Sequence, residues 1–321
     1  MKVNKICVLG GTGFVGGHIV QRLAASGKEV TVITRHPQRN RNLLVTPGVR
    51  LVRADIHDQA TLQAQFAEHD AVINLVGVLN EFPRRGVTFR KVHVELAKTV
   101  VEACRKAKVK RLLHMSALNA DEAHGTSEYL RSKGLAENQT FIAGSAEIAI
   151  TSFRPSVIFG PDDSFFNRFA QLLRLSPAVF PLACPNSKLS PVYIGDVASA
   201  FEAALENPAS FGKHYDLCGP RTFTLKELVE YTARCLGLKR LVAGLGQGLS
   251  KFQARVFEFA PGKPFTRDNY LSLQMDSVCK DDGLAALGVS PTDIEAVVPA
   301  YLSGKNQRQR YNRFRGLAGR G

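Results

Sequence analysis

The chain has 321 residues, and 45% of them are hydrophobic, which is enough apolar material for one large core or for a large and a small one. It opens without a charged and apolar leader and holds no apolar run as long as a spanning helix, so we expect neither a standard secretion signal nor an integral membrane protein. The six cysteines are scattered without a Cys-x-x-Cys pair, which favours reduced thiols in a cytoplasmic protein over a disulfide framework or a metal site.

The charge is strongly basic and uneven. The formal net charge is +14, and residues 305–321 supply six Lys or Arg and no acid. Because this segment is also rich in Gly, Gln and Asn, we predict a disordered basic tail. Two interpretations are open: an electrostatic tether to anionic lipid or to an acidic protein partner, or a solvated tail that aids solubility. We do not expect a nucleic-acid partner, because no aromatic-interleaved or groove-reading module accompanies the charge.

Apolar runs alternate with helix-period stretches through the first half of the chain. The predicted strands are Ile6–Leu9, Val30–Ile33, Val49–Val52, Ala71–Leu75, Arg111–His114 and Ile148–Phe153. Helices are predicted near residues 14–26, 59–67, 88–107 and 126–143. This alternation predicts an α/β fold with a doubly wound parallel (Rossmann) sheet and helices on both faces.

The regular alternation of predicted strands and helices ends after Gly160-Pro161. Helices are predicted near residues 165–175, 195–206, 224–236, 246–259, 267–275 and 291–302, with short strands near 214–217 and 240–242. We predict a Rossmann domain over residues 1–212 with a cap insertion near 161–190, a smaller C-terminal cap over 213–302 and the basic tail over 303–321. The phenylalanines of the cap are interpreted as packing residues rather than a ligand box; they are Phe165, Phe166, Phe169, Phe252, Phe257 and Phe259.

The first predicted strand runs directly into a glycine-rich turn. Gly10, Gly13 and Gly16 follow the spacing Gly-x-x-Gly-x-x-Gly, with Thr12 and Phe14 between them, and a helical period follows. Glycines at a strand–helix turn let the backbone approach a pyrophosphate, and the helix N-terminus offers unpaired N–H groups to the anion. In this context the turn predicts a dinucleotide site.

The end of the second predicted strand indicates which dinucleotide binds. NAD-preferring sites commonly place an acid there, whereas this chain has Thr34, Arg35 and His36. A guanidinium grips a 2′-phosphate that an acid would repel, so Arg35, helped by Arg39 or Arg41, favours NADP(H) over NAD(H). The alternative is an exposed loop arginine.

Two further strand ends are expected to contact the cofactor. Asp55 is placed to accept from the adenine amino group while Ile56 packs against the ring. The alternative for Asp55 is a cap or turn former for the helix that begins near Asp58. Leu75 and Gly77 end the fourth strand, where a small residue lets the middle of the cofactor pass close by.

A candidate catalytic set follows the fifth strand. Ser116 ends that strand, and Tyr129 and Lys133 are four residues apart, so both lie on one face of a helix. An adjacent ammonium favours the phenolate of a tyrosine, whose unperturbed pKa of about 10 is too high for acid–base work near neutrality. Lys133 is also placed to hold the nicotinamide ribose, while the serine hydroxyl orients a substrate oxygen. The alternative is a half-buried anchor tyrosine beside a solvated lysine.

These motifs together resemble an extended or atypical short-chain dehydrogenase/reductase. The matching residues are the Gly10/Gly13/Gly16 turn, Asp55, Ser116, Tyr129 with Lys133, and the segments Arg154–Pro161 and Pro191–Val197. Within that superfamily, residues 114–120 and 129–137 are similar to a narrower group, which includes the nucleotide-binding accessory subunit of respiratory complex I and its bacterial relatives.

The resemblance implies tightly held NADPH, a peripheral position beside a membrane on its inner face, and in the respiratory subunit a structural role rather than turnover. It also implies that residues 154–160 pass near the nicotinamide, with Pro155 and Ile158 closest. The chain departs from many extended members at Ala117, where they carry a second hydroxyl residue. It keeps Ser116, Tyr129 and Lys133, however, which is more than a purely structural cofactor holder requires.

Three functions are therefore compared. The first is an NADP(H)-binding protein of the accessory-subunit type, peripheral to a membrane complex. The second is an NADP-dependent oxidoreductase or nucleotide-sugar epimerase that uses the Ser-Tyr-Lys set. A binding-only redox sensor ranks last, since it has no need of the Tyr129 and Lys133 pair.

Overall fold

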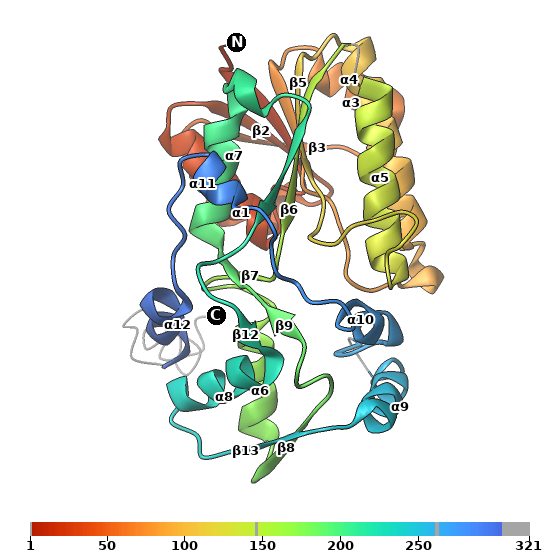
Figure 1. Cartoon of the computed structure of the whole chain (residues 1–321). Coiled ribbons are helices and arrows are strands. Elements are labelled where there is room, and N and C mark those ends of the chain that lie inside the picture. The colour runs from red at the N-terminus through yellow and green to blue at the C-terminus, as the bar shows by residue number, and fades with distance from the viewer. Residues whose placement is uncertain (1, 145–146, 261–262, 304–321) are drawn as a thin grey trace.

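A computed structural model of the chain describes residues 2–144, 147–260 and 263–303. Its centre is a seven-stranded sheet with the order β11-β6-β5-β4-β1-β2-β3, in which every neighbouring pair is parallel (Figure 1). The strands are β1 (Lys5–Leu9), β2 (Glu29–Thr34), β3 (Val49–Arg53), β4 (Ala71–Asn74), β5 (Arg111–Met115), β6 (Ala149–Pro155) and β11 (Lys213–Leu217). The predicted Rossmann sheet is confirmed, and the basic tail at 305–321 lies outside the described residues.

Helices cover both faces of the sheet, as Figure 1 shows. One face carries α1 (Phe14–Ala25), α7 (Ile194–Leu205) and α11 (Gly283–Ala286), and the other carries α3 (Gln59–Phe66), α4 (Leu96–Lys106) and α5 (Glu128–Gly144). The strand order reverses between β1 and β4, where the connections leave toward opposite edges of the sheet. A crevice at the carboxyl ends of these strands is where open α/β sheets bind their ligands.

The helix predicted over residues 88–107 is continuous, but its first part has π-helical geometry. Residues Arg90–Glu95 form a π-helical turn, and α4 begins only at Leu96. Such a turn carries an extra residue, and π-turns inside helices are frequent at functional sites. Here it carries His93, whose side chain is 3% exposed.

The cap has its own apolar core. It contains α6 (Phe166–Leu175), α8 (Leu225–Cys235) and α12 (Ile294–Leu302), with the paired strands β8 (Val179–Leu182) and β13 (Leu241–Gly244). Short strands β9 (Lys188–Leu189) and β12 (Phe223–Thr224) pair beside it, and β7 (Ile158–Phe159) pairs with β10 (Val192–Tyr193). Two further helices, α9 (Gln247–Phe257) and α10 (Arg267–Ser272), lie at one side of the cap (Figure 1). None of the helices in the described part of the chain is long and apolar enough to cross a membrane.

The predicted packing role of the cap phenylalanines holds for three of the six. Phe166 is fully buried, and Phe165 and Phe169 pack partly buried against the same core. In contrast, Phe252 and Phe259 are 65% and 86% exposed, and Phe257 is also exposed. The difference arises because α9 turns its small residues inward, which the spacing of apolar residues alone does not reveal.

The last strand of the sheet comes from residues 213–217, which the sequence pattern predicts to lie in the cap. β11 pairs with β6 over Lys213–Leu217, and α11 packs against it, so the chain returns from the cap to the Rossmann unit. The proposed division at residues 212 and 213 otherwise stays a prediction. A short strand of five residues does not disclose by itself which sheet it joins.

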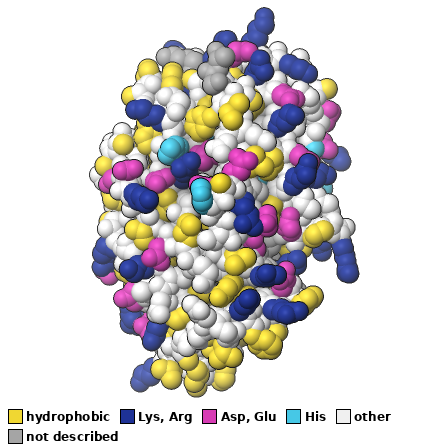
Figure 2. All heavy atoms as spheres, turned by 45° about the vertical axis from the view of Figure 1, so that its right-hand side comes forward, with side chains coloured by type: hydrophobic (Ala, Val, Ile, Leu, Met, Phe, Trp, Pro, Cys, Tyr) yellow, Lys and Arg dark blue, Asp and Glu magenta, His cyan; other side chains and the backbone are white. Residues whose placement is uncertain are grey.

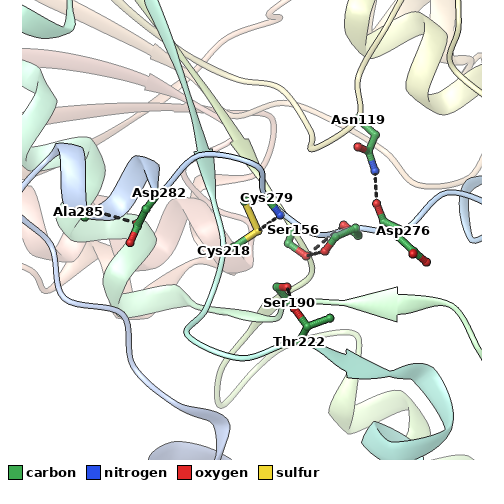
Figure 3. Close-up of a disulfide and its surroundings, with 10 residues drawn as sticks. Asn119, Ser156, Ser190, Cys218, Thr222, Asp276, Cys279, Asp282 and Ala285 are labelled. Atoms are coloured by element: carbon green, nitrogen blue, oxygen red, sulfur yellow. Dashed lines mark hydrogen bonds between the residues drawn. A yellow bond between two sulfur atoms is a disulfide. The ribbon is translucent and has the colours of Figure 1, made fainter.

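The expectation that the chain has no disulfide is wrong for one pair of cysteines. Cys218 follows β11, Cys279 lies between α10 and α11, and the two are bonded although they are 61 residues apart (Figure 3). Nearby, Asn119 Nδ2 donates to the Asp276 carbonyl at 2.8 Å, which ties the same returning segment to the loop after β5. The tertiary return of the chain, not a motif, brings the two cysteines together. The four other cysteines are free.

Candidate functional site

The glycine turn after β1 is closed to side chains. Gly10 has a φ of +78°, and a Cβ on Gly16 would lie 2.2 Å from the Gly10 carbonyl oxygen. Gly13 is the N-cap of α1, no side chain caps the helix, and no acid occupies its first turn. Thr12 is exposed at the turn and Phe14 is half-buried. The first-turn N–H groups and the positive end of the helix therefore suit a pyrophosphate.

The end of β2 presents an arginine to solvent. Thr34 is the last residue of β2, and its hydroxyl accepts from the His36 N–H at 3.3 Å. Arg35 and His36 are exposed, and within the described residues no ion pair or hydrogen bond holds the Arg35 guanidinium. Arg39 is also exposed. The side chain of Arg41, at the start of α2 (Arg41–Leu44), lies outside what the structure describes.

Asp55 lies exposed beyond the end of β3. Its Oδ1 accepts from the His57 N–H at 3.0 Å. The N-cap of α3 is Asp58, whose Oδ1 accepts from the Ala60 N–H at 3.1 Å. The helix-cap alternative thus belongs to Asp58, while Asp55 forms a turn and keeps acceptor capacity toward solvent. Ile56 packs partly buried against the core on the α3 face.

The end of β4 passes close to the turn and to Lys133. The Leu75 N–H donates to the Leu9 carbonyl at 3.0 Å, and a Cβ on Gly10 would lie 3.1 Å from the Leu75 carbonyl carbon. A Cβ on Gly77 would lie 3.2 Å from Lys133 Nζ. A side chain at Gly77 would therefore crowd the lysine ammonium, and glycine leaves room for it.

Lys133 is buried, with 3% exposure. Its ammonium donates to the Met115 carbonyl at 2.8 Å. Burial lowers the pKa of Lys133 from 10.5 to about 8, and the negative charge of Glu137 opposes part of that fall. Burial of a charged ammonium is unfavourable, so a buried lysine with a lowered pKa is typical of functional sites.

Tyr129 lies one helical turn before Lys133. Its ring makes edge contacts with Phe89 and His93, at centroid distances of 6.0 and 5.7 Å. Burial, and then the negative charge of Asp268, raise the pKa of Tyr129 to about 12. The phenol is therefore held neutral in this geometry, which is opposite to the phenolate that the paired ammonium was expected to favour.

The hydroxyl of Ser116 faces a buried ion pair. It donates to Glu137 Oε2 at 3.2 Å, and Arg154 pairs with the same carboxylate at 2.9 Å. Glu137 is 1% exposed, so its charge depends on these donors. Ser116 thus lies at the expected strand end but is engaged with Glu137 on α5.

Three side chains of this region were not found from the sequence. His93 Nε2 accepts from the Val78 N–H at 3.1 Å, which assigns the proton to Nδ1, 2.9 Å from Ser132 Oγ. Burial, reinforced by Lys133, lowers the pKa of His93 to about 2, so the ring is neutral. Asp268 accepts from the Glu128 and Tyr129 N–H groups and so holds the N-terminus of α5 from about 140 residues away. Of these three, only Glu137 could have been found from the sequence, since it follows Lys133 by four residues on the same helical face.

The segment after β6 lies at the carboxyl end of the sheet. Pro155 is buried at the end of β6, and its carbonyl accepts from the Leu118 N–H at 3.0 Å. Ile158 is half-buried in β7 and packs against the core on the α1 face. Both therefore lie at the carboxyl edge of the sheet, and their contact with the nicotinamide stays a prediction.

Comparison with known proteins agrees with this geometry. Residues 6–218 match the model of the NAD dependent epimerase/dehydratase family. The chain is 30% identical, over 90% of its length and 77% of the relative, to the mitochondrial NADH dehydrogenase [ubiquinone] 1 alpha subcomplex subunit 9 of Rattus norvegicus. Among solved structures, MoeE5 in complex with UDP-glucose and NAD has a TM-score of 0.73 at 19% identity, covering 96% of this chain and 100% of that chain. The NADPH-dependent quinone oxidoreductase QOR2 of Escherichia coli, complexed with NADPH, also has a TM-score of 0.73 at 19% identity, covering 91% of this chain and 98% of that chain. The resemblance drawn from the motifs is confirmed.

Proposed function

Since the chain belongs to the NAD dependent epimerase/dehydratase family, we propose that its nicotinamide dinucleotide is NADP(H), held by an accessory-type protein rather than turned over. The protein would work in the cytoplasm, at the inner face of a membrane that carries a respiratory complex. This extends to the chain what the name of its rat relative says of that protein, a subunit of NADH dehydrogenase.

The observation that carries the NADP(H) preference is Arg35. It follows Thr34 at the carboxyl end of β2, it is exposed, and no described side chain pairs with it. No acid stands in the Thr34-Arg35-His36 segment to repel a 2′-phosphate. A guanidinium that has no protein partner offers its whole fork of N–H donors to such a phosphate.

The test is a titration of the full chain with NADPH and with NADH. We expect NADPH to bind at least about tenfold more tightly, since a charged hydrogen bond contributes about 1.5–3 kcal/mol. Arg35→Ser should weaken NADPH binding by about tenfold or more and leave NADH binding unchanged. Arg50→Ser is the matched control, because Arg50 is an exposed arginine in β3, opposite Thr31 and away from the strand end. Equal affinities of the unaltered chain for the two coenzymes would remove the role given to Arg35.

Support for holding rather than turnover comes from the candidate catalytic set. Ser116 donates to Glu137, the Lys133 ammonium donates to the Met115 carbonyl, and the pKa of Tyr129 is raised to about 12. An acid–base pair needs the opposite arrangement, with a tyrosine pKa lowered toward neutrality. We expect the purified protein to retain NADPH and to consume it slowly or not at all.

A second candidate, an NADP-dependent oxidoreductase or nucleotide-sugar epimerase, is favoured by one observation. Tyr129 and Lys133 are one turn apart on α5, and the Lys133 ammonium lies against Gly77 at the end of β4. The bound coenzyme would supply or accept a hydride, Lys133 would hold its ribose, and Tyr129 would hold or give the proton at the substrate oxygen. If quinones, ketones or nucleotide sugars drive NADPH consumption, Tyr129→Phe should abolish it. A rate that survives this change would exclude Tyr129 as the acid–base group.

A further inference from the structure

Helix α9 (Gln247–Phe257) has an outward face that is more apolar than its inward face. The residues it buries are Ser250 and Ala254, each 1% exposed. The residues it turns outward include Leu249, Phe252 and Val256, which are 61%, 65% and 48% exposed. A helix on the surface of a protein surrounded by water normally shows the reverse pattern. Contiguous exposed apolar groups of this kind mark a surface that meets a partner.

The surface beside these side chains is strongly basic. A cavity of about 1060 Å³ opens between α9, the start of α10 and the loop near Phe82. Its cationic lining residues are Arg84, Arg85, Lys251, Arg255, Lys263 and Arg267, and its acidic lining residue is Glu258. In the described part of the chain none of these cations forms an ion pair with a carboxylate. Figure 2 shows hydrophobic side chains gathered at the lower end of this face, with Lys and Arg side chains close above them.

We propose that this surface, formed by α9 and the basic cavity, docks onto the headgroups of an anionic phospholipid bilayer. The inference rests on the membrane association in the proposed function and gives it a specific site. The ammonium of Lys263 is held by the Glu81 carbonyl at 2.9 Å, and the other five cations would meet lipid phosphates. The exposed apolar side chains of Leu249, Phe252 and Phe259 would enter the interface between headgroups and acyl chains. Long Lys and Arg side chains suit this arrangement, because their stems lie along apolar groups and their charges reach outward.

The combination of exposed aromatic side chains with unpaired cations favours a bilayer over an acidic protein. An acidic partner would neutralise the cations but would leave Phe259, 86% exposed, without an apolar environment unless it also carried a matching pocket. A bilayer interface supplies anionic and apolar groups together, and it places no demand on detailed shape. The two attractions reinforce each other, so the proposal requires that both contribute to binding.

The experiment is co-sedimentation of the full chain with vesicles of phosphatidylcholine and phosphatidylglycerol in equal parts. We expect binding to these vesicles and little to phosphatidylcholine alone, and added salt should weaken it. Removing two charges with Lys251→Gln and Arg255→Gln together should lower the partition coefficient about 30-fold, since each cation near an anionic surface contributes about 1 kcal/mol. Phe252→Ser should lower it by about tenfold without changing the charge. These side chains are exposed, so both variants should fold, which circular dichroism would verify.

The matched controls are Lys98→Gln with Lys106→Gln on α4, and Val45→Ser at the end of α2, where Val45 is 80% exposed. They remove the same charge and a comparable apolar group from the Rossmann unit and should bind vesicles like the unaltered chain. Vesicle binding that the α9 variants leave intact would overturn the proposal, and loss on deleting residues 305–321 would then assign binding to the tail. No binding to anionic vesicles at all would also overturn it. NADPH titration of the same variants tests the cofactor proposal separately, so one can fail without the other.

Discussion

The buried charge of Lys133 should lower the stability of the folded protein, and this effect can be tested without a substrate. Its pKa falls from 10.5 to about 8 on folding, and each pKa unit corresponds to about 1.4 kcal/mol, so keeping the ammonium inside costs about 3 kcal/mol at neutral pH. Lys133→Met removes that charge with little change of volume, but it also removes the hydrogen bond to the Met115 carbonyl, worth about 1–2 kcal/mol. The variant should therefore be more stable than the unaltered protein by about 1–2 kcal/mol at pH 7.

The pH dependence separates this charge effect from a packing effect. Below pH 8, Lys133 is protonated in both the folded and the unfolded chain, so the full cost of the buried charge is present. Between pH 8 and pH 10.5 the folded chain releases the proton while the unfolded chain keeps it, and the stability of the unaltered protein rises relative to the variant. The advantage of Lys133→Met should shrink over this range and then reverse in sign.

The assay is urea unfolding of both proteins without coenzyme, at several pH values from about 7 to about 10. Other titrating groups are common to both chains, so their contributions cancel in the difference. A difference in the free energy of unfolding that stays constant over this range would refute the argument. The same substitution should have the opposite effect on cofactor binding. The Lys133→Met protein should bind NADPH more weakly than the unaltered protein if the lysine holds the ribose.

Three further changes test particular contacts. Gly16→Ala should destabilise the protein by about 3 kcal/mol or more and abolish NADPH binding, because the new Cβ would lie 2.2 Å from the Gly10 carbonyl oxygen; thermal unfolding and coenzyme titration measure both. Arg111→Lys should lower the free energy of unfolding by about 2–3 kcal/mol, since the fully buried guanidinium donates to several carbonyl and hydroxyl oxygens that an ammonium cannot reach together. A loss below about 0.5 kcal/mol in urea unfolding would contradict the importance given to these hydrogen bonds. Cys218→Ser should lower the free energy of unfolding by up to about 4 kcal/mol, because the bond to Cys279 closes a loop of 61 residues. In urea unfolding, a reductant should destabilise the unaltered chain by the same amount and should leave the stability of Cys218→Ser unchanged.

Much of the fold follows from local patterns in the sequence. The runs around Ile6 and Val30 are nearly continuous apolar segments, because strands in a parallel sheet are buried on both faces, and the helical periods between them predict the crossovers. The turn at Gly10 is equally readable, since it needs a positive φ that an L residue rarely adopts. These features depend on neighbours in the chain, so the chain itself encodes them.

Other features depend on which distant segments meet. β11 joins the central sheet and Cys218 bonds to Cys279 only because the chain returns from the cap, and no spacing within either segment records that return. The ammonium of Lys133 is buried beside Glu137, and Asp268 holds the N-terminus of α5 from a remote helix. The environment that sets each pKa is built from such contacts.

The sequence by itself thus determined the Rossmann sheet, the dinucleotide turn and the family, since each rests on short-range periodicity or on residues that a turn requires. Only the tertiary structure decided that Ser116 faces Glu137, that the Tyr129 phenol is held neutral, and that α9 turns its apolar side chains outward. The physical reason is that burial and charge at a side chain are sums over neighbours in space, and most of those neighbours are far away along the chain.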